Sequence, residues 1–121
     1  MVEGRPVLVV DDDEEIRSTI CELLEAAGYP VERAADGLEG IRAIEQGRPS
    51  LVLLDMHMPE LDGPGLARLL AERGFDPPIV VMTATSRDVG QVANAIGATA
   101  WLKKPFDLAD LLELVAQYRV P

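Results

Sequence analysis

The chain has 121 residues, of which 48% are hydrophobic and 26% are charged, and its formal net charge is −10. This length and composition predict one folded domain, residues 1–121, with a single buried core, and they exclude a disordered chain. Direct binding to nucleic acid is disfavoured, because proteins hold phosphate backbones with clustered Lys and Arg and this chain carries a large net negative charge. The sequence has neither a long apolar run nor a signal-peptide pattern, which predicts a cytoplasmic protein with no membrane partner.

The first half of the chain alternates short apolar runs with helical patterns. Residues 6–10 are continuously apolar, which is typical of a strand buried on both faces of a parallel sheet. A helix is predicted over residues 16–27, with apolar side chains at helical spacing and Gly28 as its stop. Residues 31–35 form the second predicted strand, and Asp36 is predicted to cap the second helix. Its expected core-facing residues are Leu38, Ile41 and Ile44, and its expected end is at Gly47 and Pro49.

The second half repeats the alternation. Strands are predicted over residues 51–54, 79–82 and 100–103. A helix is predicted after each of these strands. The first of these helices ends before Gly74, the second ends before Gly97, and the third starts after Asp107, which is its predicted cap. Their expected core-facing residues are Leu66, Leu69 and Leu70, then Val89, Val92, Ala93 and Ile96, then Leu108, Leu111, Leu112 and Val115. Five alternations of strand and helix predict an α/β, doubly wound sandwich with helices on both faces of a parallel sheet.

Polar side chains gather where four of these strands end. In an open parallel sheet the ligand binds beyond the carboxyl ends of the strands, so these side chains should meet there. The residues concerned are Asp11, Asp12, Asp55, Thr83, Lys103 and Lys104.

Three carboxylates in one crevice repel one another and need a compensating cation. Mg²⁺ suits this set, because it prefers oxygen ligands and is commonly held by one or two carboxylates and a phosphate oxygen. A lysine ammonium and a threonine hydroxyl can stabilise the oxygens of a transferring phosphoryl group, and one carboxylate can act as its nucleophile. The set therefore predicts phosphoryl chemistry assisted by a divalent cation.

Four segments together resemble the signature segments of response-regulator receiver domains of two-component signal transduction, and single-domain chemotaxis-type regulators in particular. They are VLVVDDDEEIR (7–17), LVLLDMHMPELDG (51–63), VMTA (81–84) and WLKKPF (101–106). The resemblance covers essentially the whole chain. It implies a flavodoxin-like (βα)5 fold with a five-stranded sheet in the order 2-1-3-4-5. It also implies a phosphoacceptor that catalyses its own phosphorylation and slow dephosphorylation and is not a turnover enzyme.

The resemblance assigns a role to each acidic residue of the set. Asp55 is implied to be the phosphoacceptor. The cation, Mg²⁺ or Mn²⁺, is implied to bind Asp12 directly, Asp11 mostly through water, Asp55, and the backbone carbonyl of His57. The side chain of His57, the one histidine of the chain, is an alternative phosphohistidine or metal ligand, but the family tolerates many side chains there.

The resemblance also implies how phosphorylation is sensed. Thr83 is implied to bond a phosphoryl oxygen, and Lys104, which precedes proline, to contact the phosphoryl group while Lys103 faces solvent. The switch is implied to consist of Thr83 and Trp101. The threonine moves toward the phosphoryl group, the aromatic side chain turns inward to fill the space left, and the face of the fourth helix, fifth strand and fifth helix shifts. Trp101 is also compatible with ordinary core packing, and its indole is larger than the usual Tyr or Phe, which could hinder the rotation.

The implied partners are a sensor histidine kinase or histidine phosphotransferase and a downstream effector protein or effector domain. The donor is expected to meet the first helix near Glu15, Ile16 and Ser18 and the loop at Pro105 and Phe106. Two other functions remain alternatives: a phosphohydrolase with an aspartyl nucleophile, and a pseudo-receiver that binds partners without phosphorylation. The single cysteine, Cys21, excludes an intramolecular disulfide and is expected to pack in the core.

Overall fold

The computed structural model describes residues 5–55, 63–74, 77–83 and 98–118. The predicted fourth helix and His57 lie outside these ranges. The described strands are β1 (Val7–Val10), β2 (Val31–Ala34), β3 (Leu51–Asp55), β4 (Ile79–Thr83) and β5 (Ala100–Lys103). The described helices are α1 (Glu14–Ala26), α2 (Gly37–Gly47), α3 (Gly63–Glu72) and α5 (Leu108–Tyr118).

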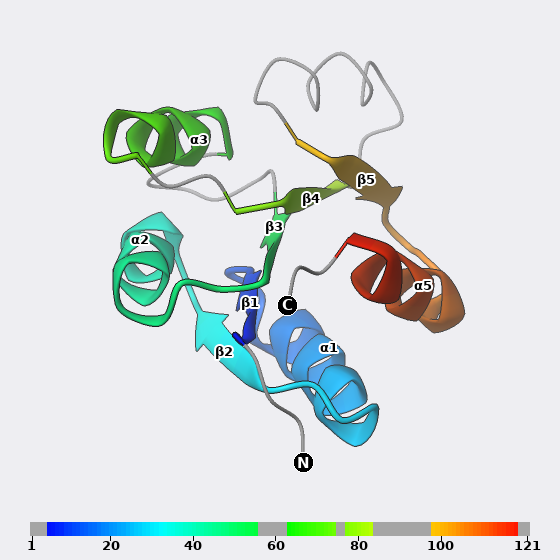
Figure 1. The fold of residues 1–121 in the computed structure, drawn as a ribbon. Helices are drawn as coiled ribbons and strands as arrows, with labels where there is room; N and C mark the ends of the chain where they lie inside the picture. Colours follow the sequence, from blue (N-terminus) through cyan, green and yellow to red (C-terminus); the bar gives the residue numbers. More distant parts are fainter. Residues whose placement is uncertain (1–4, 56–62, 75–76, 84–97, 119–121) are drawn as a thin grey trace.

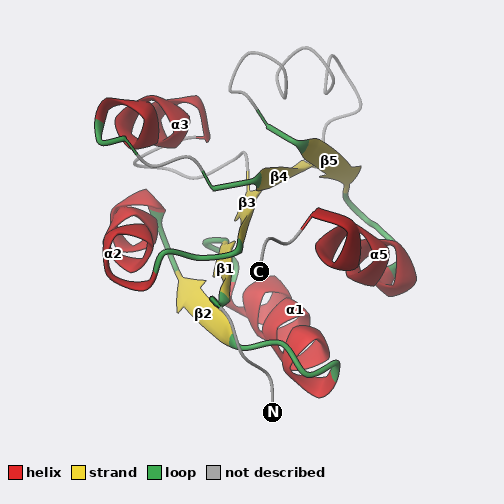
Figure 2. Ribbon diagram, in the orientation of Figure 1, coloured by secondary structure: helices red, strands yellow, loops and turns green. Residues whose placement is uncertain are grey.

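The strands form one parallel sheet in the order β2-β1-β3-β4-β5. Helices α1 and α5 cover one face of the sheet and α2 and α3 cover the other (Figure 1), so the strands lie between two helical layers (Figure 2). The predicted doubly wound fold and its strand order are therefore confirmed. One boundary matters for the site, because β3 runs one residue further than predicted and Asp55 is its last residue.

Each central strand divides its side chains between two cores. Leu8 and Val10 pack with residues of α2 and α3, whereas Val7 and Val9 pack with residues of α1 and α5. This division follows from the strand period of two residues. Every residue of β1, β3 and β4 is buried, which explains why these strands read as continuous apolar runs.

Aspartate side chains cap three of the described helices. Both predicted caps are present, because Asp36 accepts a hydrogen bond from the Glu39 backbone N–H at 2.8 Å and Asp107 accepts one from the Ala109 N–H at 3.2 Å. Asp13, which was not predicted as a cap, accepts one from the Ile16 N–H at 3.1 Å. Such caps satisfy N–H groups that have no partner within the helix. Asp13 therefore starts α1 directly after Asp11 and Asp12, which fixes where those two carboxylates leave the sheet.

Two predicted core residues are exposed, so these predictions were wrong. The exposed fraction is 54% for Leu38 and 42% for Leu108. In α2 the buried face runs through Gly37, Gly40, Ile41 and Ile44, and Leu38 lies about 100° around the helix from Gly37. Leu108 is the first residue of α5 and borders a surface pocket instead of the core.

None of the helices within the described ranges is long and apolar enough to cross a membrane.

Candidate functional site

The candidate site lies at the carboxyl ends of β1, β3, β4 and β5. Val10 is in register with Leu54 on the neighbouring strand, so the residues that follow them, Asp11 and Asp55, emerge side by side. The Lys104 backbone N–H donates a 2.6 Å hydrogen bond to the Thr83 carbonyl oxygen, which joins the ends of β4 and β5. The parallel strand ends thus bring four distant segments together, as the sequence predicts.

Asp11 is fully buried, with an exposed fraction of 0%. Its Oδ1 accepts a 3.0 Å hydrogen bond from the Asp13 N–H, and its Oδ2 accepts a 3.0 Å hydrogen bond from Lys104 Nζ. A buried carboxylate needs such partners, because desolvation without compensation costs several kcal/mol. Both oxygens of Asp11 therefore already have hydrogen-bonding partners in the protein.

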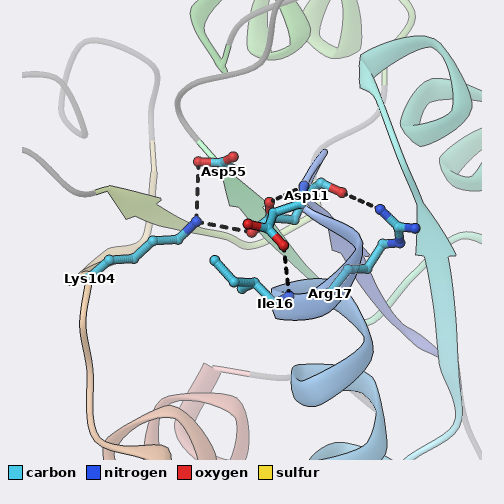
Figure 3. A network of polar contacts seen from close by, with 6 residues as sticks. Asp11, Ile16, Arg17, Asp55 and Lys104 are labelled. Carbon is cyan, nitrogen blue, oxygen red and sulfur yellow. Dashed lines mark hydrogen bonds and ion pairs between the residues drawn. The ribbon is translucent and has the colours of Figure 1, made fainter.

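Lys104 lies between two buried carboxylates (Figure 3). Its Nζ is 3.0 Å from Asp11 Oδ2 and 3.6 Å from Asp55 Oδ1, and its side chain is 18% exposed. The neighbouring Lys103 is exposed, as predicted. The two lysines of the chain thus occupy different environments, and only Lys104 carries its charge into the site.

The three aspartates form a group that fits a divalent cation. One carboxylate oxygen from each of Asp11, Asp12 and Asp55 lies within 4.8 Å of the others. Asp12 is exposed, whereas Asp11 and Asp55 are buried. Three negative charges at this spacing outnumber the single ammonium of Lys104, and oxygen donors of this type suit Mg²⁺ or Mn²⁺. The donor set therefore fits a hard dication.

A contact that the sequence did not predict involves Arg17 of α1. Its Nη1 donates a 2.7 Å hydrogen bond to the backbone carbonyl oxygen of Asp11, and the guanidinium is partly buried. The only hint in the sequence is an arginine one turn into the helix that follows the aspartates. Helical periodicity counts this residue as polar and does not show that it turns back toward β1.

Thr83 and Trp101, the residues expected to form the switch, differ in burial. Thr83 ends β4 and is 2% exposed. Trp101 lies on the edge strand β5 and is 49% exposed. The interpretation of Trp101 as a core tryptophan is therefore wrong. The next residue, Leu102, packs in the core under α1 and α5, so Trp101 points to the opposite face of the sheet at its edge.

A pocket lies beside the site, between α1 and the segment that joins β5 to α5. Its volume is about 180 Å³. Most of its lining is apolar, and it includes Ile16 and Phe106 from the two segments where a phosphodonor was expected. The lining residues are Glu15, Ile16, Thr19, Ile20, Phe106 and Leu108.

Cys21 lies on α1, away from the site, and its thiol has a shifted pKa. Burial raises the pKa of the Cys21 thiol, and the nearby positive charge of Arg33 opposes that rise. Arg33 is itself held by Glu25, 3.0 Å away, and this hydrogen bond raises the pKa of the guanidinium. Cys21 is fully buried and packs in the core, as predicted.

Comparisons with known proteins agree on one family. The response regulator MprA of Mycobacterium sp. strain KMS is 44% identical over 107 residues, which are 88% of this chain and 46% of that protein. The chain thus spans about half the length of the curated relatives it matches. Among solved structures, the chemotaxis protein CheY4 of Vibrio cholerae is 34% identical with a TM-score of 0.88, over 96% of this chain and 99% of CheY4.

The response regulator TrrA of Thermotoga maritima, solved in complex with Mg²⁺-BeF, is 30% identical with a TM-score of 0.83, over 95% of this chain and 99% of TrrA. The family model of the response regulator receiver domain matches residues 7–116. This chain therefore belongs to the response regulator receiver domain family of two-component signalling.

Proposed function

We propose that this domain accepts a phosphoryl group on Asp55 from a phosphohistidine donor and that phosphorylation alters its binding to an effector. The observation that carries the proposal is the position of Lys104, whose ammonium faces both Asp11 and Asp55 inside a cluster of three carboxylates. A structural ion pair needs one carboxylate for one ammonium. Here two further carboxylates are held at the same place at an electrostatic cost, which a functional cation and phosphoryl group would explain.

The chemistry is a transfer between two nucleophiles. A carboxylate oxygen of Asp55 attacks the phosphorus, the bond from phosphorus to the histidine nitrogen breaks, and the electron pair of that bond stays on the histidine. Asp55 lies at the end of a strand buried between β1 and β4, so its position is fixed before reaction. Lys104 is placed to neutralise charge on the phosphoryl oxygens, and the hydroxyl of Thr83 is proposed to donate to one of them.

A divalent cation, Mg²⁺ or Mn²⁺, is proposed to be held by Asp11, Asp12, Asp55 and the backbone carbonyl of His57. When bound, it supplies positive charge that stabilises the transferring phosphoryl oxygens. The exposed carboxylate of Asp12 is available to such an ion, whereas both oxygens of Asp11 already accept hydrogen bonds. This difference supports direct binding by Asp12 and water-mediated binding by Asp11. The structure of TrrA, solved in complex with Mg²⁺-BeF, supports the choice of metal.

The donor is proposed to be a sensor histidine kinase or histidine phosphotransferase. The pocket that includes Ile16 and Phe106 lies on the two segments that flank the site, and an apolar side chain of the donor could fill it. Such a contact would hold a phosphohistidine in front of Asp55. The effector, a separate protein or an attached domain, is proposed to read the face formed by the predicted fourth helix, β5 and α5.

Trp101 is proposed to report phosphorylation on that face, together with Thr83. The indole is 49% exposed on the edge strand, so an inward turn that accompanies movement of Thr83 toward a phosphoryl group would bury surface that is now in contact with water. Proximity supports the coupling, because Thr83 is in register with Lys103 and Val81 with Trp101 on the neighbouring strand.

The test is phosphorylation by acetyl phosphate with Mg²⁺, followed by intact mass spectrometry. The unaltered protein should gain one phosphoryl group, and Asp55→Asn should gain none. Loss of labelling in EDTA would support the metal site. No labelling of the unaltered protein would point to a pseudo-receiver, and repeated turnover of a phosphoester substrate would point to a phosphohydrolase.

A further inference from the structure

Arg17 holds the turn that carries the aspartates at two points. Its backbone N–H donates to the Asp13 carbonyl oxygen at 2.9 Å, and its Nη1 donates to the Asp11 carbonyl oxygen at 2.7 Å. Figure 3 shows the guanidinium reaching back from α1 toward Asp11. One side chain of the helix is therefore bound to Asp11, the residue that directly follows β1.

The other polar atoms of Asp11 are also engaged, each by a different part of the fold. Its N–H donates to the Ala34 carbonyl oxygen at 3.1 Å, and its carboxylate accepts from the Asp13 N–H and from Lys104 Nζ. Asp11 is fully buried, so each contact restricts its orientation. Arg17 supplies the contact that ties this residue to α1.

We propose that Arg17 is a positioning residue for the metal site, an inference that rests on the proposed function. Its hydrogen bond to the Asp11 carbonyl fixes the turn at residues 11–13 and so keeps the carboxylates of Asp11 and Asp12 close to Asp55. Groups that orient metal-binding residues without touching the metal commonly change metal affinity by about 10–100-fold when removed. Arg17 has the donor geometry and the partly buried position for this role.

The positive charge of Arg17 predicts the opposite effect on metal affinity. Removing a cation near a cation site lowers repulsion, so a purely electrostatic role for Arg17 predicts tighter Mg²⁺ binding in Arg17→Met. A positioning role predicts weaker binding. The direction of the change therefore separates the two explanations.

The experiment measures Mg²⁺ affinity by calorimetry in the full chain. We expect Arg17→Met to weaken binding by about tenfold, and Arg17→Lys to recover part of the loss because an ammonium can donate one hydrogen bond to the same carbonyl. The matched control is Arg33→Met, which makes the same change in net charge and removes an exposed ion pair between Arg33 and Glu25 of α1. Its Mg²⁺ affinity should stay close to that of the unaltered protein.

A second measurement uses the metal-free protein. The Asp13 N–H donates to Asp11 Oδ1, so its rate of hydrogen exchange, followed by NMR, reports the geometry of the turn. We expect faster exchange at Asp13 in Arg17→Met and an unchanged rate in Arg33→Met. Urea unfolding of each variant shows whether it is folded, and Arg17→Lys provides the test if Arg17→Met is not.

The possible results have distinct meanings. Equal or tighter Mg²⁺ binding in a folded Arg17→Met would overturn the positioning role, as would an unchanged exchange rate at Asp13. An equal loss of Mg²⁺ affinity in Arg33→Met would show that the loss comes from net charge or helix stability in general, and this result would also overturn the positioning role of Arg17. If the unaltered protein bound no Mg²⁺, the metal site itself would be wrong, and the role of Arg17 with it.

Discussion

Replacement of Lys104 by Met removes the ammonium that separates two buried carboxylates. At an effective dielectric constant of about 20, charges at the observed 3.0 and 3.6 Å attract by about 5.5 and 4.6 kcal/mol. Desolvation offsets much of this attraction, and the 18% exposure of the Lys104 side chain admits some water. We therefore expect the metal-free variant to lose about 2–4 kcal/mol of unfolding free energy, somewhat less than a fully buried broken pair.

Mg²⁺ should reverse part of that loss, because the ion and Lys104 compensate the same carboxylates. Binding stabilises the folded state by RT ln(1 + [L]/Kd), which is about 1.4 kcal/mol at ten times Kd and about 2.7 kcal/mol at one hundred times Kd. Suppose that Lys104→Met binds Mg²⁺ about tenfold more tightly. A Mg²⁺ concentration of about ten times the Kd of the unaltered protein is then about one hundred times the Kd of the variant, and it stabilises the variant by about 1.3 kcal/mol more than the unaltered protein.

The assay is urea unfolding followed by circular dichroism, with EDTA and with Mg²⁺. The matched control is Lys103→Met, which makes the same change in net charge at the exposed neighbouring lysine and should cost less than about 0.5 kcal/mol. The reasoning would be refuted by an equal cost for the two variants, or by a destabilisation of Lys104→Met that Mg²⁺ leaves unchanged. Phosphorylation by acetyl phosphate should be much slower in Lys104→Met despite the added metal.

Three further predictions concern separate parts of the molecule. Burial raises the pKa of the Cys21 thiol, so folding favours its protonated form. This contribution to stability is present below the thiol pKa of the unfolded chain and is lost as pH rises through the pKa of the folded protein. Urea unfolding from neutral to alkaline pH should therefore show a fall in unfolding free energy that is smaller in Cys21→Ala. Asp36→Ala removes the cap of α2 and should cost about 1 kcal/mol in the same assay at neutral pH, whereas Asp36→Asn should cost little. The half-exposed indole of Trp101 should be quenched by acrylamide in the unphosphorylated protein and less so after acetyl phosphate and Mg²⁺; unchanged quenching in fully phosphorylated protein would contradict its inward turn.

The sheet was predictable from the sequence because the central strands are buried on both faces. Every residue of β3 and β4 is buried, so the apolar runs match the strands almost residue for residue. The buried face of a helix was less predictable where that face contains glycine. A Cβ on Gly40 would lie 3.3 Å from Val10 Cγ2, so a glycine marks the close contact between α2 and β1. A pattern that counts only apolar side chains assigned Leu38 to that face instead.

The positions of the site residues that the structure describes also followed from the sequence, because the ends of parallel strands must share one edge of the sheet. Their partners did not follow. The difference in burial between Asp11 and Asp12, and the contact from Arg17, depend on how the chain turns from β1 into α1. Asp11 and Asp12 are adjacent residues of the same type, so the sequence does not indicate which of them the turn buries. The three-dimensional structure shows the difference.

The bond between Lys104 and Asp11 joins residues 93 positions apart, and it has a consequence for how the protein is made. During synthesis every residue up to Lys103 can emerge while the carboxylates of Asp11 and Asp55 still lack this ammonium. Contacts between distant parts of a chain form only after the cost of closing a long loop has been met. The acidic end of the sheet therefore cannot be completed before Lys104 has been made, and a nascent chain that stops short of it would carry Asp55 without the lysine that faces it.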